Sequence, residues 1–137
     1  ERAAKGERDN SALAGISSGM PAMALAMKLG KKASKVGFDW PNTDGVLDKI
    51  HEEVDELKVE LEAGDSDKEQ AEFGDLLFAM MNYARHRKID PDMALRAASL
   101  NFENRFRTME KAEGSLSDMT LDEMEAAWQT AKAQQSS

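Results

Sequence analysis

The chain has 137 residues, 41% of them hydrophobic and 32% charged, with a net charge of −8 and no cysteine. This length suits one domain, and the lack of cysteine excludes disulfides and thiolate metal sites. No apolar run approaches the ~20 residues of a membrane span, and no secretory signal pattern is present. We therefore expect a cytoplasmic protein that does not contact a membrane.

The negative charge is concentrated in one segment. Residues 44–75 hold 13 of the 26 acidic side chains and three lysines, so this segment has a net charge of −10 and the rest of the chain +2. Such a field repels nucleic acid, and no basic stripe with aromatic residues offsets it. Direct nucleic-acid binding is not expected, and a nucleotide would approach this segment only as a metal complex.

The first part of the chain predicts an arm, a helix and a loop. Residues 1–19 are small, charged and poor in apolar side chains, which is typical of a linker or flexible arm. Pro21 suits the first position of a helix that ends near Lys35. The glycines and proline of GFDWPNTDG then predict a loop. Trp40 in this loop is either its anchor or part of a base pocket.

The next two helices are predicted over about 46–63 and 66–87. Leucine, isoleucine and valine recur at steps of three and four in the first, which indicates one apolar stripe. Ser66 and Glu69 predict a capping box for the second, whose apolar residues lie on two sides and so need two sets of neighbours. We infer a helical bundle completed by a second copy of the chain. Gly74 costs about 1 kcal/mol relative to alanine, and close approach of another helix would explain it.

Two further helices complete the predicted fold. Asp90 and Pro91 cap one over about 91–112, and Thr120 with Glu123 forms a capping box for another over about 121–133. No segment alternates with period two. The sequence therefore predicts an all-α bundle of about five helices.

Two acidic clusters carry the functional signal. Glu52, Glu53 and Glu56 lie in one predicted helix, and Glu72 and Asp75 lie in the next. Steps of three and four place each cluster on one helix face. If the two helices face each other, five carboxylates converge, and their repulsion requires a bound cation. A set of oxygen ligands suits Mg²⁺ or Mn²⁺. The alternative for either cluster alone is a solvated acidic surface.

The ordered set of motifs resembles the MazG nucleoside triphosphate pyrophosphohydrolases. The two clusters are accompanied by VGFDWPNT, GDLLFAMMNYARHRKIDP, FENRFRTME and MEAAWQ, so the resemblance covers about residues 20–132. GFDWPN and the last tryptophan are more similar to the C-terminal of the two domains found in many members. The resemblance thus implies a MazG domain over 20–133, a preceding inter-domain linker, a tail over 134–137, and a natural protein with a further N-terminal domain.

The resemblance also implies a function and a site. Family members are all-α dimers that use Mg²⁺ to hydrolyse NTP or dNTP to the monophosphate and pyrophosphate, so a homodimer is expected here. By motif, the metal ligands are the carboxylates of both clusters, and Glu53 is our hypothesis for the general base. The residues expected to contact substrate are Asn101, Arg105, Trp128 and Lys132.

Two positions depart from the family pattern and leave alternatives open. ASLNFENRF has Ser99 and Asn101 where members often have asparagine and lysine, which removes one phosphate-binding charge. Arg105 either binds phosphate or forms an ion pair with Glu103 or a neighbouring helix, and Trp128 either packs in the core or stacks on a base. The alternatives for the whole chain are a dUTP, dCTP or phosphoribosyl-ATP pyrophosphatase, a nucleotide-binding or dimerisation module with little turnover, and a purely structural helical domain.

Overall fold

The computed structural model describes residues 9–136, which form five α-helices in two compact units. Of the described residues, 9–91 form the first unit and 92–136 form the second. None of the described residues lies in a strand, so the predicted all-α class is confirmed. No helix within residues 9–136 combines the length and apolarity that a membrane crossing requires. The domain boundaries drawn from the sequence stay a prediction.

Helix α1, Ala22–Lys35, packs against helix α3 and follows the predicted arm. Residues 1–8 of that arm lie outside the described residues, and residues 9–19 contain a turn at 12–15. The arm is tied to α1, because Lys32 Nζ donates to the Ala14 carbonyl at 2.8 Å. Lys32 and Lys35 in the last turn of α1 interact favourably with the helix dipole.

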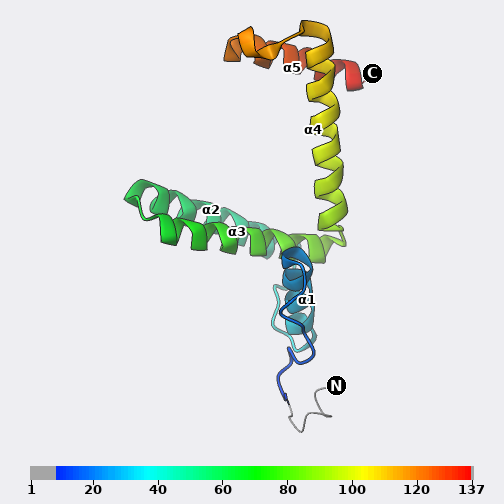
Figure 1. Ribbon diagram of the computed structural model, residues 1–137. Helices are drawn as coiled ribbons and strands as arrows, with labels where there is room; N and C mark the ends of the chain where they lie inside the picture. Colours follow the sequence, from blue (N-terminus) through cyan, green and yellow to red (C-terminus); the bar gives the residue numbers. More distant parts are fainter. Residues whose placement is uncertain (1–8, 137) are drawn as a thin grey trace. The chain divides into compact units, whose positions relative to one another are not determined.

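Helix α2, Thr43–Ala63, and α3, Ser66–Arg87, form a hairpin and lie side by side (Figure 1). The α2 helix begins three residues earlier than predicted, because the Asn42 side chain accepts from the backbone N–H of Gly45 and caps the first turn. At its other end, Gly64 adopts φ +74°, which is easily reached without a Cβ. This short connection turns the chain back on itself and pairs the two acidic clusters.

The predicted capping box of α3 is wrong, and no close approach to Gly74 occurs among the described residues of this chain. The cap is Asp65, whose carboxylate accepts from Lys68 N at 3.1 Å, so Ser66 is already helical and does not form the predicted capping box. A Cβ added at Gly74 would meet nothing within 4 Å among the described residues. Within this chain, close helix approach therefore does not explain that glycine.

The second unit consists of α4, Pro91–Glu113, a turn of 3-10 helix, Leu116–Asp118, and α5, Leu121–Ser136 (Figure 1). The capping box of α5 is confirmed: Thr120 Oγ1 accepts from Glu123 N, and Glu123 Oε1 accepts from Thr120 N. The α5 helix continues through most of the predicted tail. The buried core of this unit is Met109, Ala127 and Ala131.

Candidate metal centre

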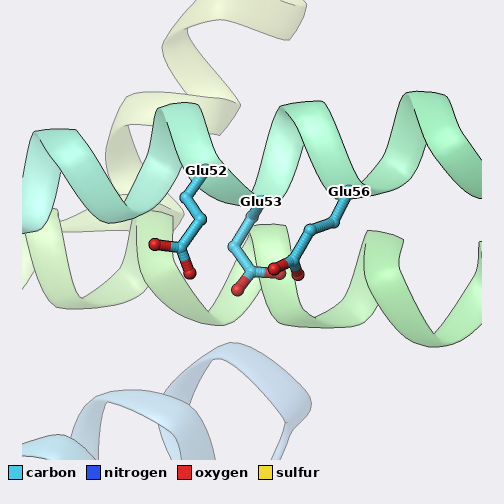
Figure 2. Close-up of side chains that lie close together, drawn as sticks. All are labelled: Glu52, Glu53 and Glu56. Carbon is cyan, nitrogen blue, oxygen red and sulfur yellow. The ribbon is translucent and has the colours of Figure 1, made fainter.

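The first acidic cluster lies on one face of α2. Figure 2 shows the side chains of Glu52, Glu53 and Glu56 leaving the helix on the same side, and one carboxylate oxygen of each lies within 4.8 Å of the others. Glu53 is 3% exposed, whereas Glu52 is at the surface. The predicted face is therefore present, with Glu53 as its buried member.

The second cluster meets the first through the same residue. Oxygen atoms of Glu53, Glu72 and Asp75 lie within 4.8 Å of one another, although Glu53 belongs to α2 and the other two to α3. The α2–α3 hairpin thus brings together the carboxylates that the sequence predicts as metal ligands. Their role as ligands stays a prediction.

The negative charge of the converging carboxylates is only partly neutralised by neighbouring side chains. Lys49 Nζ lies 2.8 Å from Glu52 Oε1 and 3.0 Å from Glu53 Oε1, and these hydrogen bonds raise the pKa of Lys49. Glu53 Oε2 and Glu72 Oε2 are buried without a hydrogen-bond partner. Desolvation, and then the neighbouring Glu56 and Glu53, raise the pKa of Glu72 from 4.5 to about 7.

These features fit a hard cation. The donor atoms are all carboxylate oxygens, which suit Mg²⁺ or Mn²⁺, and a cation would satisfy the two unpartnered oxygens while reducing the repulsion felt by Glu72. A solvated acidic surface would leave its carboxylates exposed to water, whereas Glu53 is almost wholly buried. The arrangement therefore favours a metal centre over a surface patch.

The residues predicted to contact substrate belong to the second unit. Arg105 lies with its guanidinium carbon 5.0 Å from the Trp128 ring centroid, and its Nε donates to Gln135 Oε1. Of the expected alternatives for Arg105, the ion pair with Glu103 is not formed, and Glu103 pairs with Arg107 instead. The contact with Gln135 does join Arg105 to a neighbouring helix, α5, through a hydrogen bond. The structure thus brings Arg105 and Trp128 together. Asn101 and Lys132 are also exposed positions of α4 and α5.

Trp128 also packs in its unit. Its ring centroid lies 5.1 Å from that of Phe102, and it packs against the buried core formed by Met109, Ala127 and Ala131. A hollow of about 280 Å³ lies beside it, lined in part by Phe102, Phe106 and Leu121. Packing and stacking on a base are both compatible with this position, so its role in substrate binding stays a prediction.

Comparison with known proteins identifies the relatives of this chain. It is 39% identical over 132 residues to the nucleoside triphosphate pyrophosphohydrolase/pyrophosphatase MazG of Thermotoga maritima, covering 93% of this chain and 51% of that protein. It is 40% identical over 141 residues to the nucleoside triphosphate pyrophosphohydrolase of Escherichia coli K12, covering 98% of this chain and 53% of that protein. Over nearly its whole length the chain is therefore similar to proteins named MazG nucleoside triphosphate pyrophosphohydrolase. It spans about half the length of these curated relatives, and no family model matches it.

A second cluster of charged residues in this chain was not predicted from the sequence. Asp39 Oδ1 and Oδ2 each accept from Arg85 at 2.9 Å, and Oδ1 also accepts from Trp40 N and lies 2.8 Å from His86 Nε2. The Arg85 and His86 hydrogen bonds hold the pKa of Asp39 well below its usual range. Two of the MazG-like phrases, VGFDWPNT and YARHRK, thus meet in one clasp, which we call the Asp39 clasp. Neither phrase contains a pattern that predicts this contact, because the two segments lie 46 residues apart.

Proposed function

We propose that this chain is the catalytic MazG domain of a Mg²⁺-dependent nucleoside triphosphate pyrophosphohydrolase, which releases a nucleoside monophosphate and pyrophosphate. The observation that carries the proposal is the convergence of Glu53 with Glu72 and Asp75, with two buried carboxylate oxygens left without partners. The names of the relatives from Thermotoga maritima and Escherichia coli support the reaction class.

The residues that would hold the cation are Glu52, Glu53, Glu56, Glu72 and Asp75. Bound there, Mg²⁺ or Mn²⁺ would neutralise phosphate charge and acidify a water molecule. The Oε2 atoms of Glu53 and Glu72 are buried and therefore desolvated, which strengthens their interaction with any cation. The excess of carboxylates also explains why a bare triphosphate would be repelled.

Glu53 is our candidate for the general base. Its Oε1 is already held by Lys49, while its Oε2 has no hydrogen-bond partner and could take a proton when the cation is held by the other carboxylates. The ion pair with Lys49 also fixes the orientation of the carboxylate. In the second unit, Arg105 and Lys132 supply cations for phosphate, Trp128 offers a stacking surface, and Asn101 lies one turn before Arg105.

The experiment that tests the proposal is a product assay. The chain is incubated with Mg²⁺ and a panel of NTPs and dNTPs, and the products are identified by phosphorus NMR. We expect monophosphate and pyrophosphate, and a loss of at least about 100-fold in kcat for Glu53→Gln. Asp55→Asn, an exposed acid of α2 outside both groups of converging carboxylates, is the control and should keep full activity. Formation of a nucleoside diphosphate and orthophosphate would contradict the proposed cleavage position.

We also propose a homodimer that works in the cytoplasm without binding nucleic acid. The first unit by itself leaves Phe73, Leu77 and Met80 of α3 between 44% and 51% exposed, at steps of four and three along one face. Such an apolar face on a helix that already packs against α2 is suited to a second copy of the chain. The concentrated negative charge of residues 44–75 opposes nucleic acid.

A second candidate function is nucleotide binding with little turnover. It is favoured by Asn101, which carries no charge for phosphate, and by Ser99, whose hydroxyl donates to the Leu95 carbonyl of its own helix. On this hypothesis Mg²⁺-nucleotide binds without product, and Asn101→Lys restores hydrolysis. A dUTP or dCTP preference would appear in the same substrate panel, and phosphoribosyl-ATP is added to the panel to test the third specificity.

A further inference from the structure

A cavity of about 360 Å³ lies in the first unit between α1, α3 and the GFDW loop. Its walls are mainly apolar and include Leu29 and Ala33 of α1, Phe38 and Trp40 of the loop, and Phe78 of α3. This volume is in the range of small-molecule sites, and two aromatic rings on one wall suit a flat ligand. None of the residues predicted as metal ligands lines it.

One end of the cavity is polar. Asn82, which is 5% exposed, and Arg85 line it together, and Asn82 Oδ1 accepts from Arg85 Nη2 at 3.1 Å. The hydrogen bond fixes the orientation of the Asn82 amide. A cavity with aromatic and aliphatic walls and an amide at one end matches a nucleobase, which is apolar on its faces and polar at its edges.

Gly30 of α1 keeps this end of the cavity open. A Cβ added there would lie 2.7 Å from Asn82 Oδ1 and 2.9 Å from Arg85 Nε, so no side chain fits without displacing them. The absence of a side chain lets α1 approach Asn82 and Arg85 without covering either.

The position of the cavity relative to the carboxylates suits a nucleotide. Asp75, Phe78 and Asn82 follow one another at steps of three and four, so they share one face of α3. The seven residues from Asp75 to Asn82 rise about 10 Å along the helix. This is comparable to the span from the base of a nucleoside triphosphate to its phosphates, so a nucleotide can lie along α3 with its phosphates near Asp75.

The Asp39 clasp holds the aromatic wall in place. Asp39 accepts from the Trp40 backbone N–H and from Arg85, which itself lines the cavity. The loop that carries Phe38 and Trp40 is therefore anchored to α3, the helix that carries Asn82.

We propose that this cavity binds the nucleobase of the substrate, with Trp40 and Phe38 as stacking surfaces and Asn82 facing the edge of the base. The inference rests on the proposed function, because the triphosphate must lie at the carboxylates. It assigns the base to the same compact unit as Glu72 and Asp75, whereas Trp128 belongs to the other unit.

Steady-state kinetics distinguish binding of the base from binding of the phosphates. We expect Trp40→Leu and Phe38→Leu to raise the KM for NTP about tenfold, since stacking on a base is lost. The constant for inhibition by inorganic tripolyphosphate, which has no base, should change less than twofold. Val59→Ala, a replacement at an exposed apolar position of α2 outside the cavity, is the control. Phe38 is 81% exposed, so its replacement preserves the fold even if Trp40→Leu does not. An unchanged KM in Phe38→Leu, or a parallel rise in both constants, would overturn the assignment.

Tryptophan fluorescence distinguishes failure of this inference from failure of the proposed reaction. Adding Mg²⁺-NTP should change the emission of Trp128→Phe, in which Trp40 is the remaining tryptophan, whereas inorganic tripolyphosphate should not. If this signal appears without any product, the proposed hydrolysis is wrong and the base site stands. If the signal persists in Trp40→Leu and disappears in Trp128→Phe, the base binds in the second unit and the inference is wrong.

Discussion

Glu53 of α2 and Glu72 of α3 face the same point from two different helices, and each keeps one buried carboxylate oxygen without a hydrogen-bond partner. Among the described residues, Lys49 is the one basic side chain that forms an ion pair with these carboxylates. It pairs with Glu52 and Glu53 but not with Glu72. Without a metal ion, the repulsion between these carboxylates therefore destabilises the fold, and a cation bound among them would remove that repulsion.

We predict that Glu72→Gln stabilises the protein without metal and removes its response to Mg²⁺. The neutral amide relieves repulsion by Glu53 and Glu56, so the Tm at pH 8 in EDTA should rise. Adding Mg²⁺ should raise the Tm of the wild type but not that of the variant. Differential scanning calorimetry measures both, with Glu62→Gln, at an exposed position of α2, as the control. A fall in the Tm of Glu72→Gln in EDTA would contradict the repulsion argument.

Mg²⁺ binding is predicted to release a proton near neutral pH. The pKa of Glu72 is raised to about 7 in the folded chain, so the group is largely protonated at pH 6 and ionised at pH 8. Protonated Glu72 favours the folded state. Its contribution to stability is complete below 4.5, the pKa of this group in the unfolded chain, and is lost as the pH rises through about 7. Mg²⁺ competes with this proton, so affinity should rise from pH 6 to pH 8. Calorimetric titration at pH 6.5 in buffers of different ionisation enthalpy measures the released proton, which should be absent in Glu72→Gln.

Asp39→Asn should loosen the GFDW loop. Asparagine keeps the shape of the side chain but removes the charge that binds Arg85 and His86, and we expect a loss of about 2 kcal/mol in the free energy of unfolding. Because the pKa of Asp39 lies well below its usual range, the carboxylate stabilises the fold above the ordinary aspartate pKa, and this is lost as the pH falls. Urea unfolding between pH 3 and pH 7 should show a shallower acid limb for the variant. Asp48→Asn, on the surface of α2, should behave as the wild type.

The exposed face of α3 gives a prediction about assembly. We expect the wild type to sediment as a homodimer and Leu77→Lys to sediment as a monomer, because lysine would place a charge in the apolar face formed with Phe73 and Met80. Analytical ultracentrifugation across a range of concentrations measures both. A monomeric wild type at high concentration would exclude this interface.

Gly30→Ala tests the contact between α1 and α3. Its Cβ would lie below 3.0 Å from both Asn82 Oδ1 and Arg85 Nε, so those side chains must shift, at a cost of about 1–3 kcal/mol in stability. Gly74→Ala is the matched control, since its Cβ would meet nothing within 4 Å and alanine favours the helix. In chemical denaturation, the denaturant concentration at the unfolding midpoint should therefore be lower than that of the wild type for Gly30→Ala and higher for Gly74→Ala.

Local patterns in the sequence account for most of the helical architecture. Steps of three and four along a helix place Glu52, Glu53 and Glu56 on one face, whatever the helix packs against. The capping box of Thr120 and Glu123 is equally local, and the structure confirms it. Neighbouring residues that can both cap a helix are harder to distinguish: Asp65 and Ser66 each offer an oxygen, and only the path of the turn after Gly64 decides that Asp65 is used.

Contacts between distant segments were decided by the tertiary structure. The sequence by itself determined that two acidic helix faces exist, but only the packing of α2 on α3 makes Glu53 common to both groups of carboxylates. Likewise, Asp39 and Arg85 are 46 residues apart, and each alone is an ordinary charged residue. Periodicity determines which way a side chain points from its own helix, whereas its partner on another element depends on how the helices pack together. That dependence is why the two acidic helix faces could be predicted and the Asp39 clasp could not.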